Sequence, residues 1–135
     1  MPITWNDDLK TGIADIDYQH QLFFETINKL GEVDKVKDRF YEILIELQTY
    51  VSVHFRTEEE YMRFTHYPGY QVHEECHAKF VAQYKIILKK ISQAADIMDL
   101  GPELVVFLGD WINAHYQNED VKLASHINKY RLKGC

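Results

Sequence analysis

The sequence predicts an all-α protein, an up-down-up-down antiparallel four-helix bundle with an N-terminal arm. Four segments repeat apolar residues at steps of three and four, the spacing of one helix face, and short breaks separate them. Gly and Pro number only six and three, which favours helices over a turn-rich β fold. The length of 135 residues suits one core, so we expect a single domain over 1–135.

The expected elements are an arm and four helices, at about residues 1–14, 15–30, 35–64, 70–95 and 102–129. Apolar side chains of the arm are expected to pack on the bundle. Asp15 or Asp17 is suited to cap the first helix. The Tyr67-Pro68-Gly69 turn ends the second helix. Residues 96–101 are expected to form a loop, and Pro102 suits the first turn of the fourth helix.

Composition argues against several classes of partner. The formal net charge of −6 disfavours nucleic acid or an anionic membrane surface, because both bind basic patches. No run of about 18 apolar residues is present, so no membrane insertion is expected. The start of the chain lacks a basic region followed by an apolar core, and Cys76 and Cys135 are too few for a disulfide framework. We therefore expect a cytoplasmic monomer with free thiols.

Polar residues occupy positions in the apolar stripes where a core is expected. They are His20, His54, Glu58, His73, His77 and His115, with Asp120 near them on the fourth helix. Burying one such group without a partner costs about 2–7 kcal/mol. Several in one layer must therefore satisfy each other or bind something. A metal ion does this well, because it takes imidazole nitrogens and carboxylates directly.

Spacing and depth both indicate a shared site. His54 and Glu58 are four residues apart, as are His73 and His77, so each pair lies on one helix face. In an antiparallel bundle, residues early in the first and third helices lie at the depth of residues late in the second and fourth. A single histidine on an apolar face is usually a satisfied core residue, but this conjunction predicts a metal site. Two histidines fit no stripe and are expected on the surface: His66 and His126.

The fourth helix leaves one question of geometry open. His115 and Asp120 are five residues apart, about 140° off on a regular helix, whereas Glu119 has the cleaner spacing of four. Either a local π-type turn brings Asp120 round, or Asp120 reaches a different ion from His115. Geometry alone leaves Glu119 and Asp120 about equal as ligands.

This pattern resembles the hemerythrin family over almost the whole chain. The matching segments are Trp5 in the arm, Asp17-Tyr18-Gln19-His20, His54-Phe55-Arg56-Thr57-Glu58-Glu59, Met62, the Tyr67-Pro68 turn, His73-xxx-His77 with Phe80, and Trp111-Ile112-Asn113-Ala114-His115 with Asp120. All seven ligand positions of the family are present at the family's spacing. The resemblance therefore favours Asp120 over Glu119.

The resemblance implies a non-haem di-iron centre that binds dioxygen. The implied ligands are His73, His77 and His115 for one iron, His20 and His54 for the other, and Glu58 and Asp120 as bridges. An oxo or hydroxo ion is the third bridge, and the second iron keeps an open position for dioxygen. The implied oxygen pocket is lined by Phe23, Phe24, Phe55, Trp111, Ile112 and Tyr116.

Tyr116 departs from the family pattern, which usually has an aliphatic residue directly after the histidine of the fourth helix. Tyr116 lies four residues before Asp120, so the two share a helix face. Two interpretations stay open. The phenol enters the oxygen pocket, where its hydroxyl meets the bound ligand or a water, or it turns toward the end of the bundle.

The resemblance implies reversible dioxygen binding for storage, delivery or scavenging, and no enzyme activity is expected. Carboxylate-rich di-iron oxidases carry paired Glu-xx-His motifs, whereas only Glu74 and His77 form one here. One alternative is an oxygen or redox sensor. Another is a di-iron oxidase or peroxidase, which Tyr116 keeps open. The same ligand types also admit zinc or manganese.

Overall fold

A computed structural model describes residues 5, 9–32, 37–93 and 100–133 of the chain. The described residues form an all-α bundle, which confirms the predicted fold class. Its helices are α1 (Ala14–Glu32), α2 (Lys37–Phe64), α3 (Tyr70–Gln93), α4 (Leu100–His115), the π-helical turn η2 (Tyr116–Asp120) and α5 (Val121–Lys133). None of these helices is long and apolar enough to cross a membrane.

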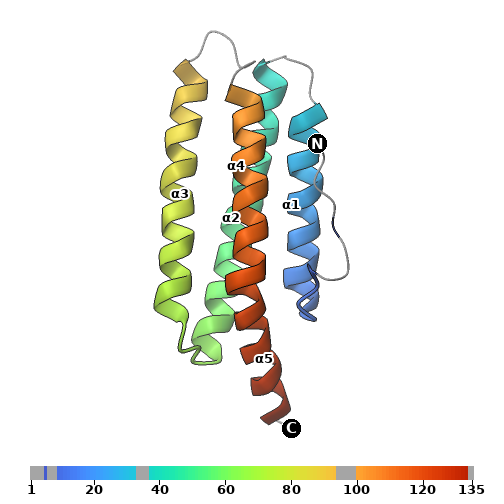
Figure 1. Cartoon of the computed structure of the whole chain (residues 1–135), viewed down its shortest axis with the longest axis vertical. Helices are drawn as coiled ribbons and strands as arrows, with labels where there is room; N and C mark the ends of the chain where they lie inside the picture. Colours follow the sequence, from blue (N-terminus) through green and yellow to red (C-terminus); the bar gives the residue numbers. More distant parts are fainter. Residues whose placement is uncertain (1–4, 6–8, 33–36, 94–99, 134–135) are drawn as a thin grey trace.

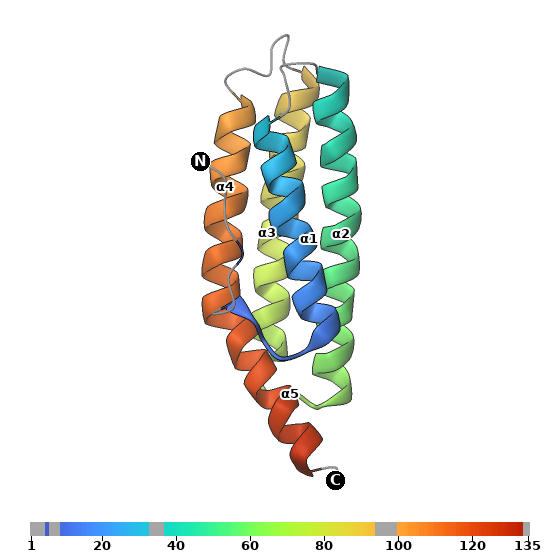
Figure 2. The ribbon, with the colours of Figure 1, turned by 90° about the vertical axis from the view of Figure 1, so that its right-hand side faces the viewer.

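Helices α1 to α4 lie side by side and alternate in direction (Figure 1). Helix α1 contacts α2 and α4, and α3 contacts the same two neighbours. Helix α5 continues from α4 through η2 and extends past the turn between α2 and α3 (Figure 2). This arrangement brings the beginnings of α1 and α3 beside the end of α2 and the junction of α4 with η2.

The bundle packs through two apolar clusters that lie on either side of a polar layer. The larger cluster includes Phe24, Phe55 and Tyr116. Along α1, His20 lies one turn from Phe24 in the larger cluster and one turn from Ile16 in the smaller one. The smaller cluster consists of Ile13, Ile16, Met62, Leu123, Ala124 and Ile127.

Asp17 ties the chain before α1 to the first turn of that helix. Its carboxylate accepts hydrogen bonds from the N–H and the hydroxyl of Thr11, at 2.7 and 2.8 Å, and from the N–H of Gly12, at 3.2 Å. Gly12 has a φ of +84°, the left-handed region that favours glycine. Because α1 begins at Ala14, neither Asp15 nor Asp17 precedes the helix as the predicted cap.

The end of α2 is closed by a residue in the left-handed conformation. His66 has a φ of 53°. The N–H of Tyr67 bonds to the carbonyl of Met62 at 2.9 Å, and the N–H of His66 bonds to that of Arg63 at 3.3 Å. This is the Schellman arrangement, which glycine usually completes. A Cβ on Gly69 would lie 2.8 Å from the Tyr67 ring, so a side chain at this position would displace that ring.

The helix bounds differ from the predicted ones chiefly in the last third of the chain. Residues 100–101 were expected in a loop but begin α4, because Pro102 is tolerated within a first turn. The predicted helix 102–129 is divided by η2 and runs on to Lys133. Parts of the predicted arm, helices and loops lie outside the described residues, at 1–4, 6–8, 33–36 and 94–99.

Candidate metal centre

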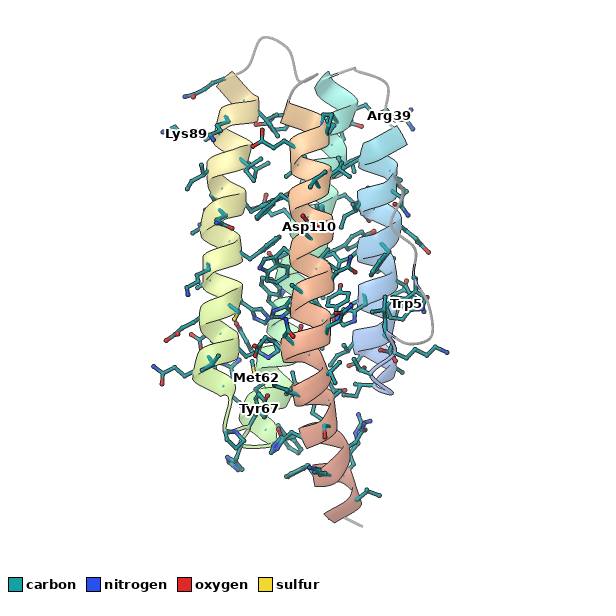
Figure 3. The ribbon with its side chains drawn as sticks, in the orientation of Figure 1. Trp5, Arg39, Met62, Tyr67, Lys89 and Asp110 are labelled. Carbon is teal, nitrogen blue, oxygen red and sulfur yellow. The ribbon has the colours of Figure 1, made fainter. Side chains whose placement is uncertain are left out.

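All seven residues predicted as ligands are buried at one level of the bundle, and each is at most 5% exposed. Figure 3 shows nitrogen and oxygen atoms gathered inside the bundle at the height of Trp5, above Met62. The seven come from every long helix of the bundle. In chain order they are His20 on α1, His54 and Glu58 on α2, His73 and His77 on α3, His115 at the end of α4, and Asp120 in η2.

The histidines turn the same ring nitrogen, Nε2, toward the centre of the layer. The Nε2 atoms of His20 and His54 lie 3.2 Å apart. Those of His77 and His115 are also 3.2 Å apart. Nitrogen atoms at this distance cannot all be protonated without repulsion. Their lone pairs are therefore directed at two small regions, one for each pair of rings.

Asp120 reaches both regions with its two carboxylate oxygens. Its Oδ2 lies 3.0 Å from Nε2 of His20. Its Oδ1 lies 3.0 Å from Nε2 of His115 and 3.1 Å from Nε2 of His73. One carboxylate therefore faces histidines of both groups, which is the arrangement that a bridging ligand needs.

Glu58 repeats this arrangement from the opposite helix. Its Oε1 contacts Nε2 of His54 and lies 3.9 Å from Nε2 of His77. Its Oε2 lies 2.8 Å from Nε2 of His73. The ligand atoms consequently fall into two sets, each within 4.8 Å, that share Glu58. They are His73, His77, His115 with Glu58, and His20, His54, Asp120 with Glu58.

The π-helical turn η2 brings Asp120 into this layer. The N–H of Val121 bonds to the carbonyl of Tyr116, a bond across five residues instead of the four of an α-helix. With this wider turn, Asp120 is 2% exposed, while Glu119 is half-buried and belongs to neither set of ligand atoms. Of the alternatives that spacing left open, the π-type turn is therefore the one observed.

Sequence reasoning missed two residues that lie behind the histidines. Nδ1 of His54 donates to Oε1 of Gln19 at 2.8 Å, and the amide of Gln19 donates to the hydroxyl of Thr57 at 3.0 Å. Oε1 of Glu59 lies 3.6 Å from Nδ1 of His77. Such contacts orient a metal-binding ring and fix its tautomer. One feature of the sequence could have indicated Gln19: it directly precedes the predicted ligand His20, on a helix that packs beside α2 and its histidine.

The two other histidines lie outside the layer. His66 is exposed, as predicted, and ends α2. The prediction of a surface position is wrong for His126, which is half-buried. Its Nε2 donates to the carbonyl of Thr65 at 2.8 Å, and its ring lies 5.1 Å from that of Tyr67. His126 thereby links α5 to the end of α2.

Aromatic rings border the layer on the side of the larger apolar cluster. Phe55 stacks on His77 with 3.7 Å between ring centroids. Trp111 stacks on His115 at 4.4 Å. These contacts hold the rings of two predicted ligands and keep water from them. Buried in the same cluster are three further residues of the predicted oxygen pocket: Phe23, Phe24 and Ile112.

Tyr116 lies inside the bundle, beside the ligand layer. It is 2% exposed, and its ring stacks on that of His20 with 3.4 Å between centroids and 21° between planes. The Tyr116 hydroxyl is buried without a hydrogen-bond partner among the described residues. Burial and the nearby charges of Asp120 and Glu58 raise the pKa of this phenol well above its usual value. The interpretation in which Tyr116 turns toward the end of the bundle is thus not the one observed.

The pKa values of histidines in the layer are shifted in opposite directions. Burial disfavours protonated His54 and His73, but the adjacent carboxylates of Glu58 and Asp120 outweigh it and raise the pKa to about 9 and about 10. Burial and the neighbouring His115 and His73 lower the pKa of His77 to about 2. Asp120 is also buried, yet His115 and the hydrogen-bonding histidines hold its pKa well below the usual value.

The polar atoms of the layer do not satisfy one another fully. Both carboxylate oxygens of Glu58, Nε2 of His73 and Oδ1 of Asp120 are buried, and the short contacts among them lack hydrogen-bond geometry. A metal ion satisfies such a group, because it binds carboxylate oxygens and neutral imidazole nitrogens directly. Imidazole nitrogens with bridging carboxylates suit iron, zinc or manganese in chemical type. The residues present therefore fit a pair of metal ions.

Comparison with known protein families also indicates a domain that binds cations. Residues 11–127 match the hemerythrin HHE cation binding domain. The chain belongs to the hemerythrin family. This assignment confirms the resemblance that favoured Asp120 over Glu119, and the domain's description as cation binding agrees with the chemistry of the layer.

Relatives within the hemerythrin family cover most of the chain. The bacteriohemerythrin of Pseudomonas aeruginosa strain UCBPP-PA14 is 34% identical over 87% of this chain and 76% of its own length. That of Clostridium acetobutylicum is 31% identical over 86% and 94%. A solved hemerythrin with tyrosine in place of a leucine superposes with a TM-score of 0.84 and 25% identity, over 94% of this chain and 98% of that one.

Proposed function

We propose that this protein binds dioxygen reversibly at a pair of iron ions, for storage, delivery or scavenging. The observation that carries the proposal is the pairing of ligand sets that share Glu58, while Asp120 contacts histidines of both sets. The names of the bacteriohemerythrin, myohemerythrin and hemerythrin relatives support iron as the metal and dioxygen as the ligand.

The seven side chains divide unequally between the two ions. We assign His73, His77 and His115 to one iron. His20 and His54 would hold the other, Glu58 and Asp120 would serve both, and an oxo or hydroxo ion would complete the pair. Because three histidines would hold the first ion and two the second, a small molecule would bind on the side of His20 and His54. When bound, a ferrous pair supplies that position and the electrons that dioxygen binding needs.

The residues around the ligands restrict what reaches the ions. Phe55 and Trp111 cover the rings of His77 and His115. Phe23 meets the His54 ring edge-on at 5.2 Å between centroids. A wall of this kind excludes water, whose protons would favour loss of the bound ligand in a reduced form. Reversible binding, and not oxidation of a second substrate, is therefore the activity that the described residues support best.

The decisive experiment is exposure of the iron-loaded protein to air. The ferrous protein is expected to be colourless, to turn pink-violet in air and to bleach again under argon. The variant His54→Ala is expected to lose the colour, because it removes a ligand of the oxygen-binding iron. Colour that decays irreversibly with release of peroxide would instead indicate a di-iron oxidase, and an unchanged spectrum of His54→Ala would refute the assignment of that ligand.

Other aspects of the function stay predictions. These are the cytoplasmic location, the monomeric state, and the lack of nucleic-acid and membrane partners. A sensor role differs from storage in requiring a partner whose contact changes with oxygen. Comparing pull-downs of the ferrous protein with and without air distinguishes the two.

A further inference from the structure

The hydroxyl of Tyr116 differs from that of the other buried tyrosine among the described residues. Tyr84, which is 4% exposed, donates its hydroxyl hydrogen to the carbonyl of Leu44 at 3.0 Å. The Tyr116 hydroxyl is equally enclosed and has no partner among the described residues. A buried hydroxyl without a partner is costly, so its presence in the core calls for an acceptor that arrives with a ligand.

The position of the ring limits what that acceptor is. Tyr116 lies face to face with His20, and its centroid is 6.4 Å from that of His54. Phe24 borders it on the apolar side, at 6.1 Å between centroids. The phenol therefore stands beside the two histidines that we assign to the iron with the open position. Nδ1 of His20 is also buried without a partner, but it lies on the side of the ring away from Nε2, which faces the centre.

We propose that the Tyr116 hydroxyl donates a hydrogen bond to a small anionic ligand bound at the open position beside His20 and His54. This inference rests on the proposed function, and it names a residue that influences which ligands the di-iron site prefers. The bound iron ions attract an anion, and the negative charge of Asp120 and Glu58 weakens that attraction. A directed donor adds to the attraction, and its hydrogen bond strengthens with the charge on the acceptor.

The test compares azide binding to the iron-loaded, oxidised protein and to two phenylalanine variants. Azide is a small anion whose binding is followed by its absorption band. Tyr116→Phe is expected to raise the dissociation constant of azide about 10- to 100-fold, the usual effect of a hydrogen bond to a charged group. The matched control is Tyr84→Phe, which also removes one buried hydroxyl but lies outside the centre. The dissociation constant of azide from Tyr84→Phe is expected to stay within about twofold of the wild-type value.

A second measurement separates ligand contact from a structural effect. In the metal-free protein, Tyr116→Phe is expected to leave the melting temperature unchanged or raise it, because it removes a hydroxyl without a partner. Tyr84→Phe is expected to lower it, because it breaks a formed hydrogen bond. The infrared band of bound azide is expected to shift between water and heavy water in the wild type and not in Tyr116→Phe.

The outcomes distinguish this inference from the proposed function. If the wild type binds iron and azide and Tyr116→Phe binds azide equally well, the role of Tyr116 is refuted while the di-iron proposal stands. An equal isotope shift in both proteins, or a destabilised metal-free Tyr116→Phe, also refutes it. If the wild type itself binds no iron, the proposed function fails first.

Discussion

The imidazole of His54 makes contacts on both of its ring nitrogens, and this sets the tautomer at the centre. Nδ1 donates to Gln19, so Nε2, which faces Asp120 and Glu58, is the nitrogen left to bind a metal ion when the ring is neutral. The sequence could predict His54 from its stripe and from its spacing to Glu58. It could not predict Gln19, because the contact depends on how α1 packs against α2. The partially buried Glu59 beside His77 was missed for the same reason.

Gln19→Leu is expected to weaken iron binding about 10- to 100-fold, since it removes the acceptor that orients His54. Iron affinity is measured by competition with a chelator. Gln19→Glu keeps an acceptor and is expected to restore most of the affinity. The control Gln48→Leu alters an exposed glutamine of α2 and is expected to have no effect. Equal affinities for Gln19→Leu and Gln48→Leu would show that the contact does not position the ring.

The junction of α4 and α5 is the element whose form the sequence left open. The π-helical turn η2 absorbs one residue and so rotates Leu123 and Ile127 by about 100° relative to a regular helix. With this rotation both are buried in the bundle, as are Leu108 and Ile112. Spacing from His115 alone could not choose between Glu119 and Asp120, because the choice depends on the packing of α5.

Deleting the exposed Asn118 is expected to convert η2 into a regular α-helical turn. The apolar face then runs on in phase, so far-UV circular dichroism is expected to stay strongly helical. The deletion leaves Asp120 four residues after His115, so its carboxylate stays on the same helix face. We therefore expect the variant to keep two iron ions per chain. A deletion variant that holds fewer than two would mean that the wider turn itself is needed to place this ligand.

In the molecule as a whole, one buried polar layer lies between two apolar clusters. Four stripes of apolar residues are enough to predict the bundle, because helices of this kind have few other ways to bury their faces. The depth of the polar residues along the stripes also predicted that they would meet. What the stripes could not give is the charge state of the layer, which depends on distances between side chains of different helices.

The stability of the metal-free protein is expected to be greatest near pH 6.5. The pKa values of His54 and His73 are raised to about 9 and 10, so the stabilisation they give is complete below 6.5 and is lost as pH rises toward those values. The pKa values of His77 and His20 are lowered, so these two residues resist protonation in the folded protein. Stability is therefore lost as pH falls below 6.5, where the unfolded chain takes up protons. Melting temperatures measured from pH 4 to 10 check this. A metal-free melting temperature that rises steadily to pH 9 would contradict it.

The most direct measurement is the iron content of the purified, reconstituted protein, determined by elemental analysis against the protein concentration. Seven buried side chains in two sets that share Glu58 predict two iron ions per chain, and one or none after His73→Ala. A wild-type protein that holds a single ion, or none, after reconstitution would contradict the account of a two-metal centre between these helices.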